Sequence, residues 1–137
     1  MVDDAGRSSG FLLDSNIIVA AFEEDPEVTR HLAATPSELL FIPAVALGEL
    51  YFGAMKSRRI NANRQRLEEF VAASNVLPVD AATARLYGEV RERLRSTGRP
   101  IPENDIWIAA TALQGRLALV TRDAHFGHVD GLWTERW

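Results

Sequence analysis

The sequence predicts an α/β domain with a mainly parallel sheet of four to five strands flanked by helices. Short apolar runs alternate along the chain with amphipathic segments, the pattern of a parallel sheet with helical crossovers. Neither repeats nor low-complexity linkers interrupt the alternation, and 137 residues suffice for one domain with a buried core. We therefore expect one domain over residues 11–137, preceded by a disordered tail of residues 1–10.

Five short apolar runs are the expected strands. The first has the composition of a short buried strand, and the fifth is expected at an edge of the sheet. In chain order they are residues 11–14 (FLLD), 39–43 (LLFIP), 75–79 (NVLPV), 117–121 (LALVT) and 132–137 (LWTERW).

Six amphipathic or apolar segments between these runs are the expected helices. Ser15 or Asn16 is positioned to cap the first, Asp25 and Pro26 form a cap and first-position pair for the second, and Asp80 precedes the fifth. The expected helices are residues 15–22, 26–34, 44–55, 61–74, 81–96 and 105–114.

Composition excludes several classes of site. The chain has no cysteine, which rules out disulfides, thiolate metal sites and cysteine nucleophiles. No apolar run approaches the roughly 20 residues that span a bilayer, and the N-terminus lacks the apolar core of a secretory signal, so we expect a cytoplasmic protein without a membrane partner. The net charge of −4 is weak evidence against a nucleic-acid substrate, because four acids binding cations would leave 15 basic and 15 acidic residues.

Three acidic residues lie at the ends of predicted elements. Asp14 ends the first strand, Asp123 lies two residues past the fourth apolar run, and Asp105 opens the sixth helix. Each also has a local explanation, as a helix cap, an Asx-turn or a charge at a helix N-terminus. Ser15 and Asn104 are positioned to take over the capping roles, which would leave Asp14 and Asp105 free for other work.

Glu49 lies within the helix expected over residues 44–55. Its neighbours at i−4, i−3, i+3 and i+4 are Val45, Ala46, Phe52 and Gly53. Because this helix is apolar nearly all round, we expect it to be buried, and a buried carboxylate is costly unless its charge is compensated. The alternative is an edge position at which Glu49 reaches water.

These acids share one expected location. Because sites in parallel sheets form beyond the carboxyl ends of the strands, Asp14, Asp105 and Asp123 are expected to line one mouth, with Glu49 pointing in from below. Thr121 adds a hydroxyl on the side of Asp123, since alternate strand residues share a face. Crowded carboxylates repel unless cations are present, and oxygen ligands without cysteine or a well-placed histidine favour Mg²⁺ or Mn²⁺ over Zn²⁺.

Four motifs, LLDSNIIVAAF, GELYFGAM, PENDIWIAATAL and LVTRDAHF, occur in the order and spacing of the PIN-domain ribonucleases. On these motifs the chain resembles that family from residue 11 to residue 137, most closely the VapC and FitB-like toxins of toxin–antitoxin pairs. The resemblance implies a PIN-like three-layer α/β/α fold. It also implies a Mg²⁺- or Mn²⁺-dependent endoribonuclease that cleaves RNA phosphodiester bonds with a metal-activated water.

The resemblance also implies site residues. Carried over position by position, the acidic metal site falls on Asp14, Glu49, Asp105 and Asp123, with Thr121 at the hydroxyl position before the last acid. Asp14 and Asp105 are expected to be direct ligands and Asp123 a second-site or water-mediated ligand. Glu49 is expected to orient or deprotonate the attacking water.

Control by a partner follows from the same resemblance. We expect an RNA substrate, a cognate antitoxin protein, a homodimer and a toxin–antitoxin hetero-oligomer. The helical segments 16–22 and 27–34 lie next to Asp14 in the sequence-based scheme, and we expect them to form an apolar groove for an antitoxin helix. The tail of that helix would place an Arg or Lys against the carboxylates.

Two other functions are weighed against the ribonuclease. One is a non-catalytic PIN module that acts through protein contacts. The other is aspartyl phosphotransfer, which is disfavoured because the phosphatases need a second Asp where Asn16 stands and receiver domains need a late Lys, whereas the last Lys is Lys56.

Two further features have weaker interpretations. His125 and His128 have a metal-compatible i, i+3 spacing, but the PIN family does not use it and a plain loop role is favoured. Clustered basic residues are either phosphate contacts or solvated helix faces; they are Lys56, Arg58, Arg59, Arg64, Arg66, Arg91, Arg93, Arg95 and Arg99.

Overall fold

A five-stranded sheet forms the centre of the protein. The computed structural model describes residue 6 and residues 8–137, so residues 1–5 and 7 of the expected tail lie outside the described residues. The strands follow the order β3-β2-β1-β4-β5, and every neighbouring pair is parallel, which confirms the predicted sheet. They are β1 (Phe11–Leu13), β2 (Leu40–Pro43), β3 (Asn75–Leu77), β4 (Ala118–Val120) and β5 (Thr134–Glu135).

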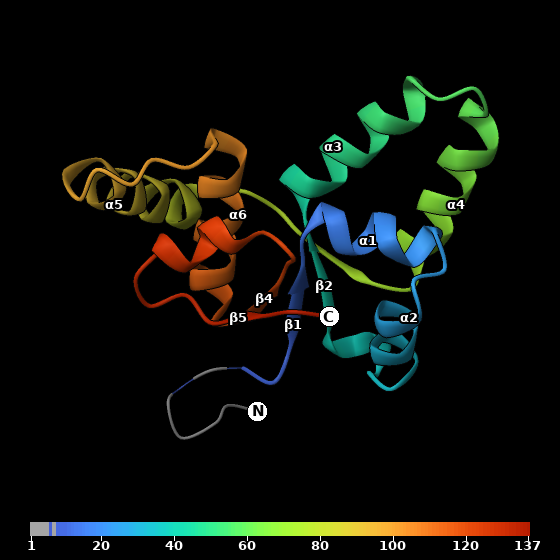
Figure 1. The fold of residues 1–137 in the computed structure, drawn as a ribbon, viewed down its shortest axis with the longest axis horizontal. Helices are drawn as coiled ribbons and strands as arrows, with labels where there is room; N and C mark the ends of the chain where they lie inside the picture. Colours follow the sequence, from blue (N-terminus) through green and yellow to red (C-terminus); the bar gives the residue numbers. More distant parts are fainter. Residues whose placement is uncertain (1–5, 7) are drawn as a thin grey trace.

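Six α-helices surround this sheet in the part of the chain that the structure describes, as expected. They are α1 (Ser15–Phe22), α2 (Pro26–Ala33), α3 (Ala44–Met55), α4 (Ile60–Ala72), α5 (Ala81–Ser96) and α6 (Glu103–Gly115), with short 3₁₀ helices η1 (Ser37–Leu39) and η2 (Ala124–His128). Figure 1 shows α5 and α6 on one side of the sheet, α1 and α2 on the other, and α3 and α4 as a hairpin beside α1. In the described part of the chain, none of these helices is long and apolar enough to cross a membrane.

The strands β1, β2 and β4 are buried on both faces, because consecutive side chains point in opposite directions and helices cover both sides. Leu12 and Leu119 pack with α5 and α6, whereas the residues that follow them, Leu13 and Val120, pack with α1 and α2. The two cores on either side of one sheet give the predicted three-layer α/β/α arrangement.

The strand order places a topological switch point between β1 and β4, where ligands bind in open parallel sheets. Leu13 is paired with Val120 in the sheet, and the backbone N–H of Asp14 donates to the carbonyl of Val120 over 3.0 Å. Asp14 and Thr121 therefore leave the sheet side by side, although 107 positions separate them in the sequence.

Two capping predictions were wrong. Asp14 itself is the N-cap of α1, with Ser15 as the first helical residue. In α6 the N-cap is Pro102, and the helix begins two residues earlier than expected, so that Asn104 lies in the first turn and does not cap it. By contrast, the predicted caps Asp25 and Asp80 accept backbone hydrogen bonds at the starts of α2 and α5.

Candidate functional site

The four predicted acids line one hollow at the carboxyl end of the sheet. Its volume is about 510 Å³, and its walls come from the turn after β1, from α3, from the start of α6 and from the turn after β4. The lining residues are Asp14, Ser15, Asn16, Glu49, Pro102, Glu103, Asn104, Asp105 and Asp123. Such a concentration of carboxylates repels a phosphate unless a cation stands between them.

Asp14 is the buried member of the group. The backbone N–H of Ser15 donates to its Oδ1 over 2.8 Å, and the hydroxyl of Thr121 donates to its Oδ2 over 2.8 Å. Burial raises the pKa of Asp14, the negative charges of Asp105 and Asp123 act in the same direction, and the two hydrogen bonds oppose the rise. Thr121 also accepts a hydrogen bond of 3.0 Å from the backbone N–H of Asp123, so one hydroxyl links two of the acids.

Asp105 and Asp123 meet on either side of His125. The imidazole Nε2 lies 2.7 Å from Oδ2 of Asp105, and Nδ1 lies 3.2 Å from Oδ1 of Asp123. Burial raises the pKa of Asp105, while the contact with His125 opposes that rise. Asp105, Asp123 and His125 each offer one ligand atom, and these three atoms lie within 4.8 Å of one another. This separation is small enough for a single cation to contact all three side chains.

Glu49 faces the hollow, but the prediction that its helix is buried was wrong. Glu49 is an exposed residue, and Phe52 and Met55 on the same helix are 62% and 58% exposed. In the described part of the chain, α3 contacts α1, α4, α6 and β2, and Phe52 and Met55 remain exposed to solvent outside these contacts. Partial burial of the Glu49 carboxyl, followed by the charges of Asp14 and Asp105, still raises its pKa.

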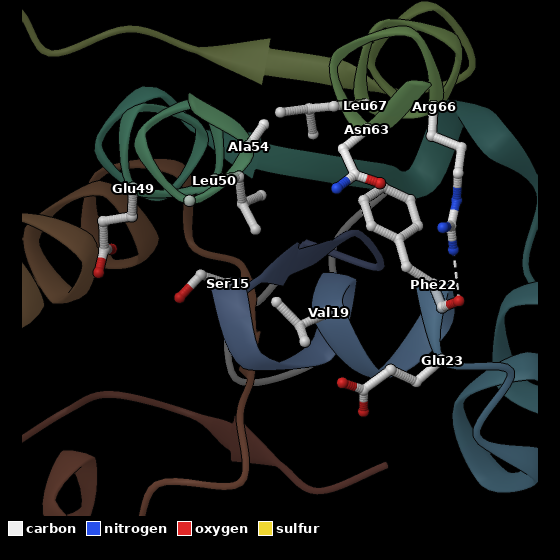
Figure 2. A pocket seen from close by; sticks show the side chains of 11 residues that line it. Ser15, Val19, Phe22, Glu23, Glu49, Leu50, Ala54, Asn63, Arg66 and Leu67 are labelled. Carbon is white, nitrogen blue, oxygen red and sulfur yellow. Dashed lines mark hydrogen bonds between the residues drawn. The ribbon is translucent and has the colours of Figure 1, made fainter. Parts of the chain in front are cut away.

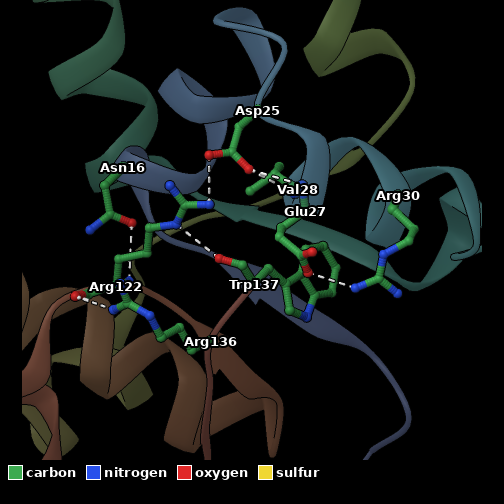
Figure 3. Close-up of polar contacts among 8 residues, drawn as sticks. All are labelled: Asn16, Asp25, Glu27, Val28, Arg30, Arg122, Arg136 and Trp137. Atoms are coloured by element: carbon green, nitrogen blue, oxygen red, sulfur yellow. Dashed lines mark hydrogen bonds and ion pairs between the residues drawn. The ribbon is translucent and has the colours of Figure 1, made fainter.

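Arg122 fixes the turn that carries Thr121 and Asp123. Its guanidinium lies 2.9 Å from Oδ2 of Asp25 and donates through Nε to the carbonyl of Trp137 over 2.8 Å (Figure 3). The pKa of Asp25 is lowered most by the hydrogen bond that its carboxylate accepts from the backbone N–H of Val28, and next by the contact with Arg122. The turn after β4 is thereby tied to the start of α2 and to the end of the chain.

A second hollow lies beside the acids, between α1, α3 and α4. Its volume is about 520 Å³, and Figure 2 shows Val19, Phe22 and Leu50 facing it, with Glu49 and Ser15 at the end nearest the acids. Arg66 of α4 donates to the carbonyl of Phe22 across this groove. The groove shares α1 with the predicted one, but α3 and α4 form its other wall in place of residues 27–34.

Sequence reasoning missed the role of His125 in this geometry. The spacing to His128 drew attention to the wrong pair, because His128 lies beside Val90 and Arg93 of α5. Asp105 lies in α6 and His125 in η2, 20 positions apart in the sequence, and no local sequence pattern indicates that they are in contact. Glu103 was also missed; it lines the acidic hollow and accepts a hydrogen bond of 2.8 Å from the Tyr87 hydroxyl.

Comparisons with known proteins agree with this architecture. A family model described as the PIN domain matches residues 11–132. The chain is 36% identical over 128 residues to the tRNA(fMet)-specific endonuclease VapC of Shigella flexneri, which covers 93% of this chain and 97% of that protein.

Two solved structures share the fold over nearly the full chain. The crystal structure of DNA-bound VapBC from Salmonella typhimurium matches with a TM-score of 0.88 at 28% identity, covering 95% of this chain and 99% of that one. VapBC-5 of Mycobacterium tuberculosis, a member of the VapBC family of toxin–antitoxin systems, matches with a TM-score of 0.71 at 31% identity, covering 94% and 98%.

Proposed function

The chain belongs to the PIN domain family, and from that premise we propose that it is a divalent-metal-dependent endoribonuclease, the toxin of a toxin–antitoxin pair. The observation that carries this proposal is the single hollow lined by Asp14, Glu49, Asp105 and Asp123. The Shigella relative is named as an endonuclease of a transfer RNA, and the Mycobacterium structure comes from a toxin–antitoxin system. RNA is therefore the substrate class that we assign.

The donor set fits a hard divalent cation, Mg²⁺ or Mn²⁺. The carboxylate oxygens of Asp105 and Asp123 lie close enough to share one ion, and Asp14 stands behind them with its negative charge directed into the same hollow. When bound, such an ion supplies a water of lowered pKa and a positive charge beside the scissile phosphate.

The chain's own residues divide the remaining work. We assign ligand roles to Asp14 and Asp105 and a second-site or water-mediated role to Asp123, with Thr121 holding the Asp14 carboxylate in place. Glu49 reaches the hollow from the opposite wall and is assigned to orient or deprotonate the attacking water. Its raised pKa favours this role, because a base works best with a pKa near the working pH.

Silencing by an antitoxin is the second part of the proposal. The groove between α1, α3 and α4 has apolar walls suited to a partner helix, and it opens toward Glu49 and Ser15. A basic side chain that follows this helix would reach the carboxylates and compete with the cation. The exposed Phe52 and Met55 on α3 support a homodimer, since large exposed apolar side chains mark contact surfaces.

Metal binding provides the first test. Calorimetry with Mg²⁺ and Mn²⁺ is expected to show weak binding by the wild-type protein and none by an Asp14→Asn, Asp105→Asn double variant. Equal binding by the two proteins would contradict the ligand assignment.

RNA cleavage and toxicity provide the second test. The purified protein with Mg²⁺ or Mn²⁺ is expected to cleave an RNA from a pool that includes initiator transfer RNA, whereas Asp105→Asn is inactive. Expression of the wild-type chain alone is expected to arrest growth, and co-expression of the neighbouring small gene is expected to restore it. A folded, metal-binding protein that cuts no RNA would be a non-catalytic module instead.

A further inference from the structure

We propose that His125 is a nitrogen ligand of the divalent cation that Asp105 binds, beside Asp123, and that it biases the site toward Mn²⁺ over Mg²⁺. Because a cation in this hollow is itself part of the proposed function, this ligand role rests on that proposal. The geometry that carries it is the position of the ring, whose two nitrogens lie 2.7 and 3.2 Å from carboxylate oxygens of the two acids.

The ring stands between two acceptors. In the neutral form that can bind a metal, an imidazole has one N–H, so it can donate to only one of Asp105 and Asp123, and its second nitrogen presents a lone pair to the other carboxylate. A lone pair that faces a carboxylate oxygen is a repulsive contact, and a cation bound by the two atoms removes that repulsion. Ligands of an octahedral ion are about 3–4 Å apart, so donor atoms within 4.8 Å need only small side-chain rotations to converge.

The three donors are held by rigid parts of the fold. Asp105 lies in the first turn of α6, next to the buried Ile106. His125 lies in η2, which is anchored by the fully buried Phe126, and Asp123 is bound through its backbone N–H to Thr121. The backbone positions of the three donors are therefore set by the packing of the fold, and contacts with Asp105 and Asp123 orient the imidazole.

A nitrogen donor changes which ion the site prefers. Carboxylate oxygens alone suit Mg²⁺ and Mn²⁺ alike, whereas imidazole adds affinity for transition metals and little for Mg²⁺. The sequence-based expectation that no histidine is placed to help therefore needs revision for this chain. Of the two ions of the proposed function, Mn²⁺ is the one that we expect to gain affinity from His125.

The test compares three untagged proteins: wild type, His125→Gln and His128→Gln. Gln at position 125 offers an amide oxygen in place of the ring nitrogen, so an oxygen-only site remains. His128 is the matched control, because it lies in the same η2 but beside α5, away from the acids. Circular dichroism checks the fold of each, and His125→Asn replaces His125→Gln if the latter does not fold.

Two readouts are independent of activity. Pulsed electron paramagnetic resonance of bound Mn²⁺ is expected to detect a directly coordinated nitrogen in wild type and His128→Gln, and none in His125→Gln. Calorimetry is expected to show a Mn²⁺ affinity about tenfold lower in His125→Gln, with the Mg²⁺ affinity changed by less than about threefold.

The outcomes separate this role from the nuclease itself. Oxygen-only coordination in a wild-type protein that cleaves RNA overturns the ligand role and leaves the ribonuclease standing. Nitrogen coordination that depends on His125 in a protein that cleaves no RNA supports the ligand role and overturns the ribonuclease. A wild-type protein that binds neither ion overturns both.

Discussion

The hydroxyl of Thr121 donates a 2.8 Å hydrogen bond to the carboxylate of Asp14, and this contact joins the ends of the two neighbouring strands β1 and β4. Both residues are buried, and a buried environment disfavours the charged form of a carboxylate. The Thr121 hydroxyl therefore opposes the rise that burial causes in the pKa of Asp14.

Removal of this hydroxyl is expected to shift the pH dependence of cleavage. In Thr121→Val the pKa of Asp14 rises further, because a hydrogen bond that lowers it is lost while burial is kept. Because the ligand role proposed for Asp14 needs the ionised carboxylate, the acidic limb of kcat/KM should move to higher pH. Thr121→Ser, which restores a donor, is the control and should keep most of the wild-type profile.

The buried carboxylate of Asp14 is also expected to lower the stability of the metal-free protein at neutral pH. Burial raises its folded-state pKa above the unfolded value, so between the two values the unfolded chain binds fewer protons and the free energy of unfolding falls as pH rises. Asp14→Asn should therefore raise the Tm at pH 7 in EDTA, by about 3 °C if the effect is that of a typical single substitution.

Measurement of the Tm of both proteins at several pH values tests the direction of this effect. Below the ordinary pKa of an aspartate both proteins are uncharged at position 14, so the difference in Tm should shrink toward zero. The exposed Asp130→Asn is the comparison variant, for which no such pH-dependent gain is expected. A variant that is less stable than wild type at pH 7 would contradict the predicted repulsive role.

Glu49→Gln is expected to abolish most cleavage without loss of fold. The amide keeps the size of the side chain but removes its basicity, and general-base catalysis contributes about 10²-fold or more. The Tm should stay unchanged or rise, since one charge leaves the crowded hollow. Glu68→Gln on α4 serves as the control at an exposed position, and near-wild-type turnover by Glu49→Gln would assign Glu49 a structural role only.

The fold was accessible from the sequence because its signals are local. Runs such as FLLD and LALVT lack polar interruptions, and the caps Asp25 and Asp80 mark helix starts that the structure confirms. Asp14 and Asp123 could be assigned to one edge of the sheet because they follow strands. Parallel strands present their carboxyl ends together, and the two acids line one hollow.

The remaining features depend on contacts that a sequence pattern does not encode. The apolar sequence around Glu49 predicted burial, but periodicity does not tell whether an apolar face is covered by the same chain, and Phe52 is exposed. The contact of His125 with Asp105 depends on how η2 packs against α6. The groove likewise depends on the α3–α4 hairpin, whose position next to α1 is a property of the assembled fold (Figure 1).

Arg122→Ala is expected to destabilise the protein by about 1.5–3 kcal/mol, the range for hydrogen bonds to charged groups. Its guanidinium joins Asp25 and the carbonyl of Trp137 at a partly buried position (Figure 3). The control is Arg30→Ala, which breaks the exposed pair with Glu27 on α2 and should cost at most about 0.5 kcal/mol. Urea unfolding measures the free energy of unfolding of both variants. Equal losses would show that the contacts of Arg122 stabilise the protein no more than an exposed ion pair does.

A negative charge introduced into the groove is expected to abolish binding of the antitoxin and to leave RNA cleavage unchanged. Val19 on α1 is 42% exposed and lines the groove between α1, α3 and α4, so Val19→Glu would place a carboxylate against the apolar face of a docked helix. The variant should lose the complex on co-purification and stay toxic when the antitoxin is co-expressed, while cleaving RNA as wild type does. Val79→Glu is the matched control, since Val79 is 41% exposed but lies after β3, outside the groove. If Val19→Glu still forms the complex and is neutralised as well as Val79→Glu, the antitoxin binds elsewhere on the protein.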